Sequence, residues 1–415
     1  MPDLQRENDN LQRLLEIARY MALTNDLDVL LGTIVEAACE VLDCERATIF
    51  LYDPRRDELY SRVAKGVEGI RFPAGRGVAG AAAQSRQCIN VPDAYTDPRF
   101  NPDVDRRTGY RTRNLLAVPM EHLNGDLIGV LQALNKPSGP FTQDDEGLAR
   151  VLAAQAGVAL DRGRLMEEYV EKQRMQRDLD IARSIQQDLF PKKSPCLAGY
   201  EIAGWNRPAD ETGGDFYDFI ALPDGRLAVL LADATGHGIG AALVTAQCRS
   251  LFRAMISVTQ DLSAMAARVN DLLAQDLAES RFVTAFVGLL DPQRHVIEYI
   301  SGGQGPLLLV TSAGVESRDA NALPFAALPE LDSTAVERFE FTPGALLALL
   351  TDGFFEAAGA SEELYGERRV RAFLEQHRER PPADLIAALN ADVERFTDGR
   401  KQADDLTAVL IRRTS

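Results

Sequence analysis

The chain has 415 residues and a formal net charge of −17, with 46% hydrophobic and 26% charged residues. A chain of this length is too long for one hydrophobic core, so two or three globular domains are expected. The acidic excess argues against binding to nucleic acid or to an anionic membrane surface.

Membrane insertion, secretion and zinc binding are not expected either. No apolar run reaches the ~18 residues of a membrane span, and the polar N-terminus is unlike a secretory signal. The five cysteines are scattered without CxxC spacing, which predicts a reducing, cytoplasmic location and no disulfide framework. Because the chain has 62 acidic residues but only four histidines, any metal site should take hard cations that prefer oxygen ligands.

The region up to residue 160 predicts a small α/β domain behind an N-terminal helix. Apolar residues recur at helical spacing up to residue 42, and short apolar runs then predict strands. Two apolar runs flank Asn124-Gly125, which is a strong hairpin signal. The predicted elements are a helix within 1–25, a helix over 27–42, strands over 47–53 and 58–66, a strand on each side of Asn124-Gly125, and a closing helix over 143–160.

Residues 161–190 predict a helical linker. The segment is rich in Glu, Lys and Arg, with no glycine after Gly163 and no proline before Pro191. Its apolar residues approximate a heptad repeat, which favours a coiled coil between two copies of the chain; the alternative is a single solvated helix. The apolar positions are Leu165, Tyr169, Met175, Leu179, Ala182, Ile185 and Leu189.

The region 195–415 predicts an α+β domain in which two packed sheets are flanked by helices, an αββα sandwich. Apolar runs predict the strands, and longer amphipathic segments predict the helices. The predicted strands cover 214–222, 227–233, 282–291, 295–303, 305–312, 335–341, 345–353 and 406–413, and the helices cover 241–256, 262–277 and 383–396.

Aspartates recur where these strands begin or end. Asp233 and Asp352 each follow a continuous apolar run, whereas Asp404 and Asp405 precede one. Asp215 follows two glycines at the start of another predicted strand. Strand ends can meet at one edge of a sheet, so these side chains are expected to converge.

Such a cluster of carboxylates predicts a site for divalent cations, Mn²⁺ or Mg²⁺. Unpaired carboxylates close together raise one another's pKa, and bound cations remove that cost. An all-oxygen ligand set favours Mg²⁺ or Mn²⁺ over zinc or copper. A pair of such ions can polarise a phosphoryl oxygen and activate water. Asp224, which lies between a proline and a glycine, is expected to be a turn residue.

The region 195–415, with the segment just before it, resembles the sporulation-stage-II-E branch of the metal-dependent (type 2C) serine/threonine protein phosphatases. Six separated motifs carry the resemblance: ARSIQQDLFP, RPADETGGDFYD, LADATGHGIGAAL, RFVTAFVGLLD, LLTDGFFEA and ADDLTAVLI. The resemblance implies a binuclear metal site at which a metal-activated water attacks phosphoserine or phosphothreonine.

The resemblance also implies roles for individual residues. Asp233 would bridge the two ions, and the backbone carbonyl of Ala234 would be a ligand. Asp352 and Asp404 would complete the ligand shell of one ion. Asp215 would bind a metal ion or orient its water, so Asp215 and Asp233 are the expected catalytic residues.

The remaining polar residues of these motifs are expected to be structural. Asp218 and Asp405 are expected to hold strand ends, and His237 to be a loop residue. The segment SGGQGPLLL, residues 301–309, stands where the family usually has an Asn-Ala-Gly-His type of segment. Arg207 is the one candidate for a phosphate contact.

Residues 26–160 resemble a GAF domain, on the segments ATIFLYD, AGRGVAGAAAQSRQCINVPDAYTDPRF, NLLAVPM and NKPSGPFTQDDE. The last segment matches the Asn-Lys…Phe-x-x-x-Asp-Glu signature of GAF domains that bind cyclic nucleotides. The resemblance implies a small-molecule ligand such as a cyclic nucleotide. The alternative is another ligand or none, with the signature lysine pairing with an acidic residue to lock a loop. The matching residues are Asn135, Lys136, Phe141, Asp145 and Glu146.

Together these features predict a cytoplasmic signalling phosphatase in which a GAF sensor acts through the linker helix on a metal site. The family resemblance suggests a phosphorylated anti-sigma-factor antagonist as the substrate, and the linker favours a homodimer. The sensor is expected to reposition the linker helix and with it the SIQQDLFP segment, residues 184–191, which would order the neighbouring metal site. Two alternatives are a catalytically silent scaffold and a hydrolase of small phosphate esters.

Overall fold

The computed structural model describes residue 12 and residues 15–414, except 22, 25, 62–69, 123, 279 and 331–334. The chain divides into two compact units, Met1–Arg174 and Met175–Ser415. The predicted N-terminal helix lies largely outside the described residues, of which 15–21 are helical.

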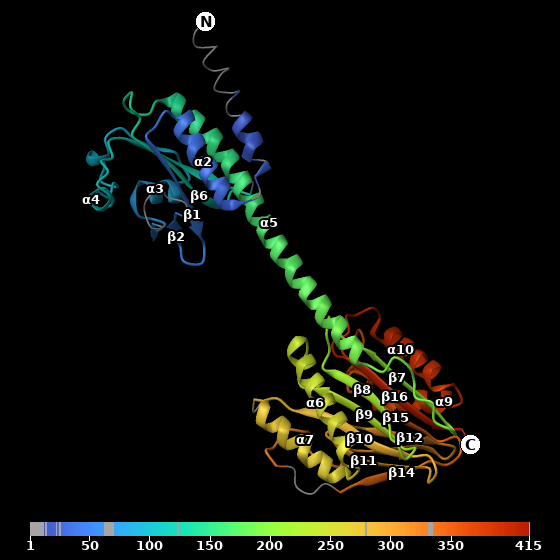
Figure 1. Ribbon diagram of the computed structural model, residues 1–415. Helices are drawn as coiled ribbons and strands as arrows, with labels where there is room; N and C mark the ends of the chain where they lie inside the picture. The colour runs from blue at the N-terminus through green and yellow to red at the C-terminus, as the bar shows by residue number, and fades with distance from the viewer. Residues whose placement is uncertain are drawn as a thin grey trace. The chain divides into compact units, whose positions relative to one another are not determined.

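The first unit is built on one six-stranded antiparallel sheet with the strand order β3-β2-β1-β6-β5-β4 (Figure 1). Helix α2 and the first part of α5 pack on one face over an apolar core, and α3 packs on the opposite face. The predicted hairpin at Asn124-Gly125 joins β5 to β6. The elements are α2 (Leu27–Val41), β1 (Arg46–Asp53), β2 (Glu58–Tyr60), β3 (Arg71–Pro73), α3 (Gly77–Ser85), β4 (Ile89–Val91), α4 (Asp103–Thr108), β5 (Leu115–Glu121), β6 (Leu127–Leu134) and α5 (Gln143–Leu189).

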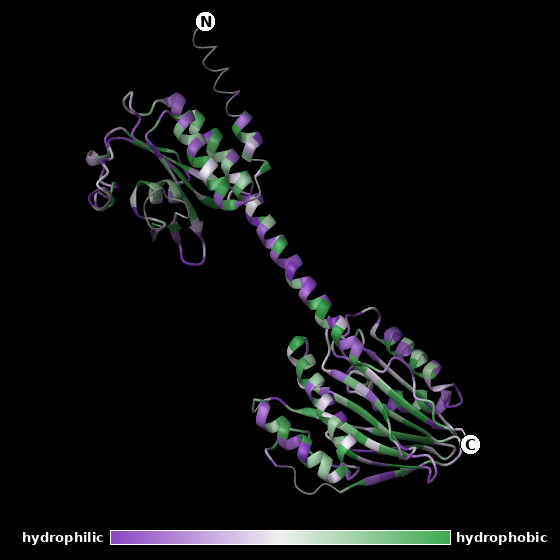
Figure 2. Cartoon of the chain, viewed as in Figure 1, coloured by the Kyte–Doolittle hydropathy of each residue, from purple (hydrophilic) through white to green (hydrophobic). Residues whose placement is uncertain are grey.

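Helix α5 is one continuous helix of 47 residues, so the predicted closing helix and linker are not separate elements. Its first part buries Ala149, Leu152 and Ala156 in the core of the first unit. Its later part is mainly hydrophilic with scattered apolar residues (Figure 2). An exposed set of large apolar side chains, which we call the α5 stripe, consists of Leu165, Met166, Tyr169, Val170, Met175, Ile181 and Ile185.

The second unit consists of two five-stranded antiparallel sheets, ordered β14-β11-β10-β9-β8 and β13-β12-β15-β16-β7. One apolar core lies between the sheets; α6 and α7 cover the outer face of the first sheet, and α8, α9 and α10 that of the second (Figure 1). The αββα sandwich predicted from the sequence is therefore confirmed. The elements are β7 (Tyr200–Arg207), β8 (Asp215–Ala221), β9 (Leu227–Ala234), α6 (Ile239–Val258), α7 (Leu262–Asp276), β10 (Val283–Asp291), β11 (Val296–Gly302), β12 (Leu307–Thr311), β13 (Gly314–Arg318), β14 (Glu337–Glu340), β15 (Leu346–Leu350), α8 (Gly353–Glu356), α9 (Gly366–His377), α10 (Pro382–Thr397) and β16 (Leu406–Arg413).

Eight of these helices and strands were not anticipated from the sequence, namely β3, α3, β4, α4, β7, β13, α8 and α9. Helix α3 is made largely of glycine and alanine and has no clear apolar periodicity. Strand β2 ends at Tyr60, earlier than the predicted 58–66. Within the described residues, no helix is long and apolar enough to cross a membrane.

Candidate metal centre

The pairing of β8 with β9 places two of the predicted metal-binding residues opposite each other. Asp215 starts β8 and pairs in register with Asp233 near the end of β9. The two strands approach closely here, because a Cβ added to Gly214 would lie only 2.7 Å from the Ala234 carbonyl oxygen. The backbone N–H of Ala234 donates to the Gly214 carbonyl at 3.0 Å.

Asp215 is tied to the other sheet. Its side chain is buried, and Oδ2 accepts hydrogen bonds from the hydroxyls of Thr351 at 2.8 Å and Thr407 at 2.5 Å. Asp405 accepts from the backbone N–H groups of Ala209 at 2.7 Å and Asp215 at 3.3 Å. Asp405 therefore joins the start of β16 to the start of β8, which is the bracing role inferred from the sequence.

The carboxylates at these strand ends are electrostatically coupled. Burial, reinforced by Asp352 and Asp404, raises the pKa of Asp233 to about 7. Burial, reinforced by Asp404 and Glu356, raises the pKa of Asp352 to about 6. Burial and the neighbouring Asp233 raise the pKa of Asp215 well above its usual value. Asp233 therefore interacts with each of the other three predicted aspartates, and Glu356 is an acidic neighbour of Asp352 that the sequence did not single out.

This coupling fits hard divalent cations, although the side chains do not form a ready coordination shell. Within the described residues, no group of three or more His, Cys, Asp or Glu side chains is arranged to hold a metal ion. The strand ends fix the backbone, whereas the carboxylates at the strand ends can turn about their side-chain torsions. Mutual repulsion of this kind is what a bound cation relieves, and an all-oxygen donor set suits Mg²⁺ or Mn²⁺.

The last turns of α5 contact the glycine pair that precedes β8. Gln186 Nε2 donates to the Gly213 carbonyl at 2.6 Å, and the Gly213 N–H donates to Gln186 Oε1 at 3.1 Å. The hydroxyl of Thr245, in α6, donates to the Gly214 carbonyl. A Cβ at Gly213 would collide with the Asp405 carboxylate, so the position requires glycine. Two helices therefore hold the backbone immediately before Asp215.

Asp218 has a structural role deeper in β8. Its side chain is almost fully buried and pairs with Arg249 at 3.0 Å and Arg253 at 2.5 Å, both on α6. It also accepts a hydrogen bond from the N–H of Phe219. Because both arginines come from one helix, this ion cluster fixes α6 on the strand that begins at Asp215.

The remaining residues of interest lie around the site. His237 is exposed and 3.1 Å from Asp210, consistent with a loop residue. Arg207, the candidate phosphate contact, is bound to Gln402 and Glu394.

The unusual segment 301–309 also supports the site. It contributes Gln304, whose Nε2 donates to the Leu350 carbonyl at 2.8 Å, two residues before Asp352. The roles of Gln304, Thr351 and Thr407 at this site were not predicted from the sequence. The one feature that could have indicated them is that each is a polar residue in or beside an apolar strand.

The five GAF signature residues make contacts within the first unit. Lys136 Nζ lies 2.9 Å from Asp145 Oδ1 and donates to the Leu42 carbonyl at 3.1 Å. Asn135 Nδ2 donates to Glu45 at 3.0 Å, Phe141 is buried, and Glu146 accepts from Asn90 at 3.0 Å. The pairing of Lys136 with Asp145 is the loop-locking alternative raised from the sequence.

Comparisons with known proteins agree with this architecture. The family model "Stage II sporulation protein E (SpoIIE)" matches residues 223–414, and the GAF domain model matches residues 26–160. The first match contains Asp233, Asp352 and Asp404 but begins after Asp215.

Two curated proteins and one solved structure illustrate the similarity. "Probable 3',5'-cyclic phosphodiesterase pde-5" of Caenorhabditis elegans is 33% identical over 172 residues, covering 37% of this chain and 23% of that protein. "Protein IcfG" of Synechocystis sp. is 25% identical over 264 residues, covering 57% of this chain and 41% of that protein. The chain thus spans less than half the length of either relative.

The SiaA-PP2C domain of Pseudomonas aeruginosa superposes with a TM-score of 0.53 and 23% identity, over 59% of this chain and 98% of that one. At this identity the similarity shows a shared fold. One assignment accounts for the two sheets with their helical layers, the coupled aspartates at their strand ends and the two family matches. The chain combines a GAF domain with a phosphatase-type domain of the SpoIIE family.

Proposed function

We propose that the chain is a metal-dependent protein phosphatase that acts on phosphoserine or phosphothreonine and is controlled by its GAF domain. The observation that carries the proposal is the set of coupled aspartates at the strand ends of a SpoIIE-type domain. Two Mn²⁺ or Mg²⁺ ions, when bound, would supply an activated water and polarise the phosphoryl group.

The chain's own residues hold and orient this site. Asp233, Asp352, Asp404 and the Ala234 carbonyl would hold the ions. The Oδ2 atom of Asp215 accepts hydrogen bonds from two threonine hydroxyls, which would hold this carboxylate in place to orient a water molecule. Burial of Asp215 and Asp233 lowers the local dielectric and strengthens their interaction with a cation.

We infer that the substrate is a phosphoprotein, with a phosphorylated anti-sigma-factor antagonist as the candidate that the family resemblance suggests. The test compares a phosphoserine protein of that class with p-nitrophenyl phosphate, each with and without Mn²⁺. A higher kcat/KM for the protein substrate supports the proposal. If the small ester were turned over much faster and the phosphoprotein were inert, a small-ester hydrolase would replace it.

The lack of a ready coordination shell within the described residues favours one alternative, a catalytically silent scaffold. A scaffold would bind its partners without metal and release no phosphate. Mn²⁺-dependent phosphate release by the purified chain therefore separates the two functions.

We further propose that the linker transmits the state of the GAF domain. Gln186, near the end of α5, bonds to the glycine pair before Asp215, so movement of α5 would disturb the catalytic strand. The α5 stripe would pair two copies of the chain, because large apolar side chains such as Leu165 and Ile185 are otherwise left in water.

A further inference from the structure

Three polar side chains form a row across neighbouring strands of the second sheet in the second unit. Thr407 in β16 pairs in register with Asn206 in β7, and the backbone N–H of Thr351, directly after β15, donates to the Thr407 carbonyl at 3.0 Å. Strands β15, β16 and β7 are neighbours in this sheet (Figure 1). Val409, two residues further along β16, belongs to the core between the two sheets. Because side chains alternate along a strand, the row faces the other sheet, where Asp215 starts β8.

The hydroxyl of Thr407 is directed toward Asp215 because Asn206 occupies its acceptor side. A threonine hydroxyl has one proton to donate and two lone pairs that accept. Asn206 Nδ2 donates to Thr407 Oγ1 at 2.8 Å, and Thr407 Oγ1 donates to Asp215 Oδ2 at 2.5 Å. If the amide of Asn206 presented its oxygen instead, that oxygen and the Asp215 carboxylate would compete for the single hydroxyl proton. The amino group of Asn206 removes this competition.

The second hydroxyl on Asp215 is directed in the same way. The backbone N–H of Thr407 donates to Thr351 Oγ1 at 2.9 Å, and Thr351 Oγ1 donates to Asp215 Oδ2 at 2.8 Å. Hydrogen bonds in such a chain polarise one another, which strengthens the bonds to the carboxylate. The donor to Thr351 is a backbone group, whereas the donor to Thr407 is the Asn206 side chain, which a substitution can remove or reverse.

The row runs from a buried end to an accessible end. Asp215, Thr351 and Thr407 are at most 2% exposed, whereas Asn206 is half-buried. Asn206 also lines a cavity of about 230 Å³, together with Gln187 and other residues from the last turns of α5. A substitution of Asn206 therefore leaves no sealed void, while the bonds that it controls lie where water is excluded and electrostatic interactions are strong.

We propose that Asn206 is a positioning residue for Asp215 and acts through Thr407. Its amino group keeps the Thr407 proton on Asp215, so the carboxylate is held in one orientation, in which it can bind a metal ion or orient its water. Asn206 itself contributes no atom to the metal site. The role of Asp215 in this inference rests on the proposed phosphatase function, whereas the link from Asn206 to Thr407 does not.

The main test is the variant Asn206→Asp, which keeps the size of the side chain but replaces the amino donor by an acceptor. The Thr407 proton would then turn to the new carboxylate and away from Asp215. Asn206→Ala removes the donor but adds no competitor, so its effect should be smaller. A residue that only filled space would give the opposite order, because aspartate matches the shape of asparagine better than alanine does.

Two measurements on the full chain give the size of the effect. Calorimetric titration gives the Kd for Mn²⁺, and phosphate release from a phosphoserine protein at saturating Mn²⁺ gives kcat. Asn206→Asp should change one of them by about 10- to 100-fold, the usual effect of losing a hydrogen bond to a charged group. The change appears in the Kd if Asp215 binds a metal ion, and in kcat if Asp215 orients the water. No change in either quantity would overturn the proposal.

A second substitution separates the hydroxyl relay from a direct effect of the added charge. In a Thr407→Val background, Asn206→Asp should have no further effect, because the proton that it redirects is gone. In a Thr407→Ser background, which keeps the hydroxyl, the full effect should return. Gln187→Glu adds the same charge at the same cavity from α5 and should match the unaltered chain. Urea unfolding confirms that each variant is folded.

Three results would overturn the proposal: an effect of Asn206→Asp that persists beside Thr407→Val, an equal effect of Gln187→Glu, or a larger effect of Asn206→Ala than of Asn206→Asp. Failure of the proposed function is a different result. If the unaltered chain bound Mn²⁺ but released no phosphate, the phosphatase function would fall, while the Mn²⁺ titration of the variants would still decide the role of Asn206. A chain that bound no Mn²⁺ would overturn both.

Discussion

Replacing Gln186 by alanine tests whether the end of α5 controls the metal site. The substitution removes both hydrogen bonds between this side chain and Gly213, at 2.6 and 3.1 Å, and leaves the helix backbone intact. The Thr245 bond to Gly214 remains, so the glycine pair should loosen without detaching from the sheet.

The expected size of the effect on Mn²⁺ binding follows from the loss of the two hydrogen bonds. At about 1 kcal/mol each, their loss disfavours the held conformation by about 2 kcal/mol, which is about a 30-fold change in its equilibrium. If only the held conformation binds metal well, the apparent Kd for Mn²⁺ rises by up to this factor. The maximal rate at saturating Mn²⁺ should change much less.

The assay is a Mn²⁺ titration of phosphoprotein hydrolysis, with Gln187→Ala as the matched control, because Gln187 is the exposed neighbour on the same helix. The control should match the unaltered chain. The reasoning is refuted if Gln186→Ala leaves the apparent Kd for Mn²⁺ unchanged, or if both variants shift it equally.

Three further predictions concern stability and assembly. Asp218→Ala removes the buried carboxylate that pairs with the half-buried Arg249, so urea unfolding should show a loss of about 3 kcal/mol; a loss below about 1 kcal/mol would contradict the bracing role. Because the folded-state pKa values of Asp233 and Asp352 are raised to about 7 and about 6, the folded, metal-free chain binds more protons than the unfolded chain. Urea unfolding in EDTA should therefore show stability falling as pH rises from about 4 to about 7, and a stability that rises over this window would count against the coupling. Tyr169→Glu places a charge in the α5 stripe and should convert a dimer to monomer in light scattering; a monomeric unaltered chain would remove the basis for the linker dimer.

The parts of the site that could be predicted from the sequence were those marked by a pattern among adjacent residues. A continuous apolar run ending in Asp233 or Asp352 marks a buried strand and its exit, and both strands lie where the pattern placed them. The turn at Asp224 and the hairpin at Asn124-Gly125 likewise depend on adjacent residues alone.

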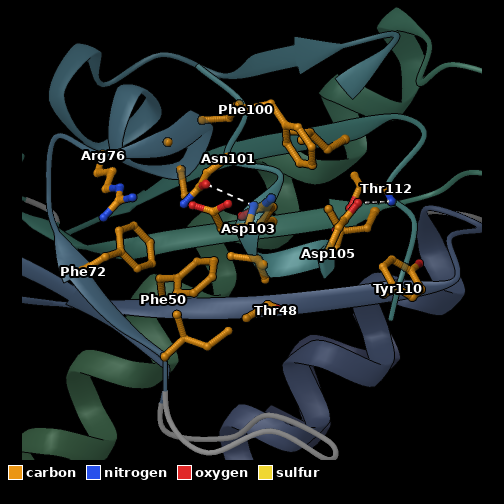
Figure 3. Close-up of a pocket in the computed structure, with 18 of the residues that line it drawn as sticks. Thr48, Phe50, Phe72, Arg76, Phe100, Asn101, Asp103, Asp105, Tyr110 and Thr112 are labelled. Atoms are coloured by element: carbon orange, nitrogen blue, oxygen red, sulfur yellow. Dashed lines mark hydrogen bonds between the residues drawn. The ribbon is translucent and has the colours of Figure 1, made fainter. Parts of the chain in front are cut away.

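The parts that the sequence did not reveal depend on contacts between distant residues. The segment 184–191 was expected near the metal site, but the bond from Gln186 to Gly213 could not be predicted from the residues around either partner. Strand β7 was missed because Tyr200–Arg207 lacks a clear alternation of apolar and polar residues. The GAF signature identified the domain, whereas its lysine is engaged with Asp145, and the cavity of about 640 Å³ in the first unit is lined by other residues (Figure 3).

The most direct test of the central claim is Mn²⁺-dependent phosphate release from a phosphoserine protein by the variants Asp233→Asn and Asp224→Asn. Both changes remove one carboxylate from the same hairpin, but Asp224 lies in the exposed turn, where it bonds to Arg226. We predict that Asp233→Asn abolishes Mn²⁺-dependent release while Asp224→Asn retains the full rate. Undiminished Mn²⁺-dependent release by Asp233→Asn would contradict the assignment of the metal centre.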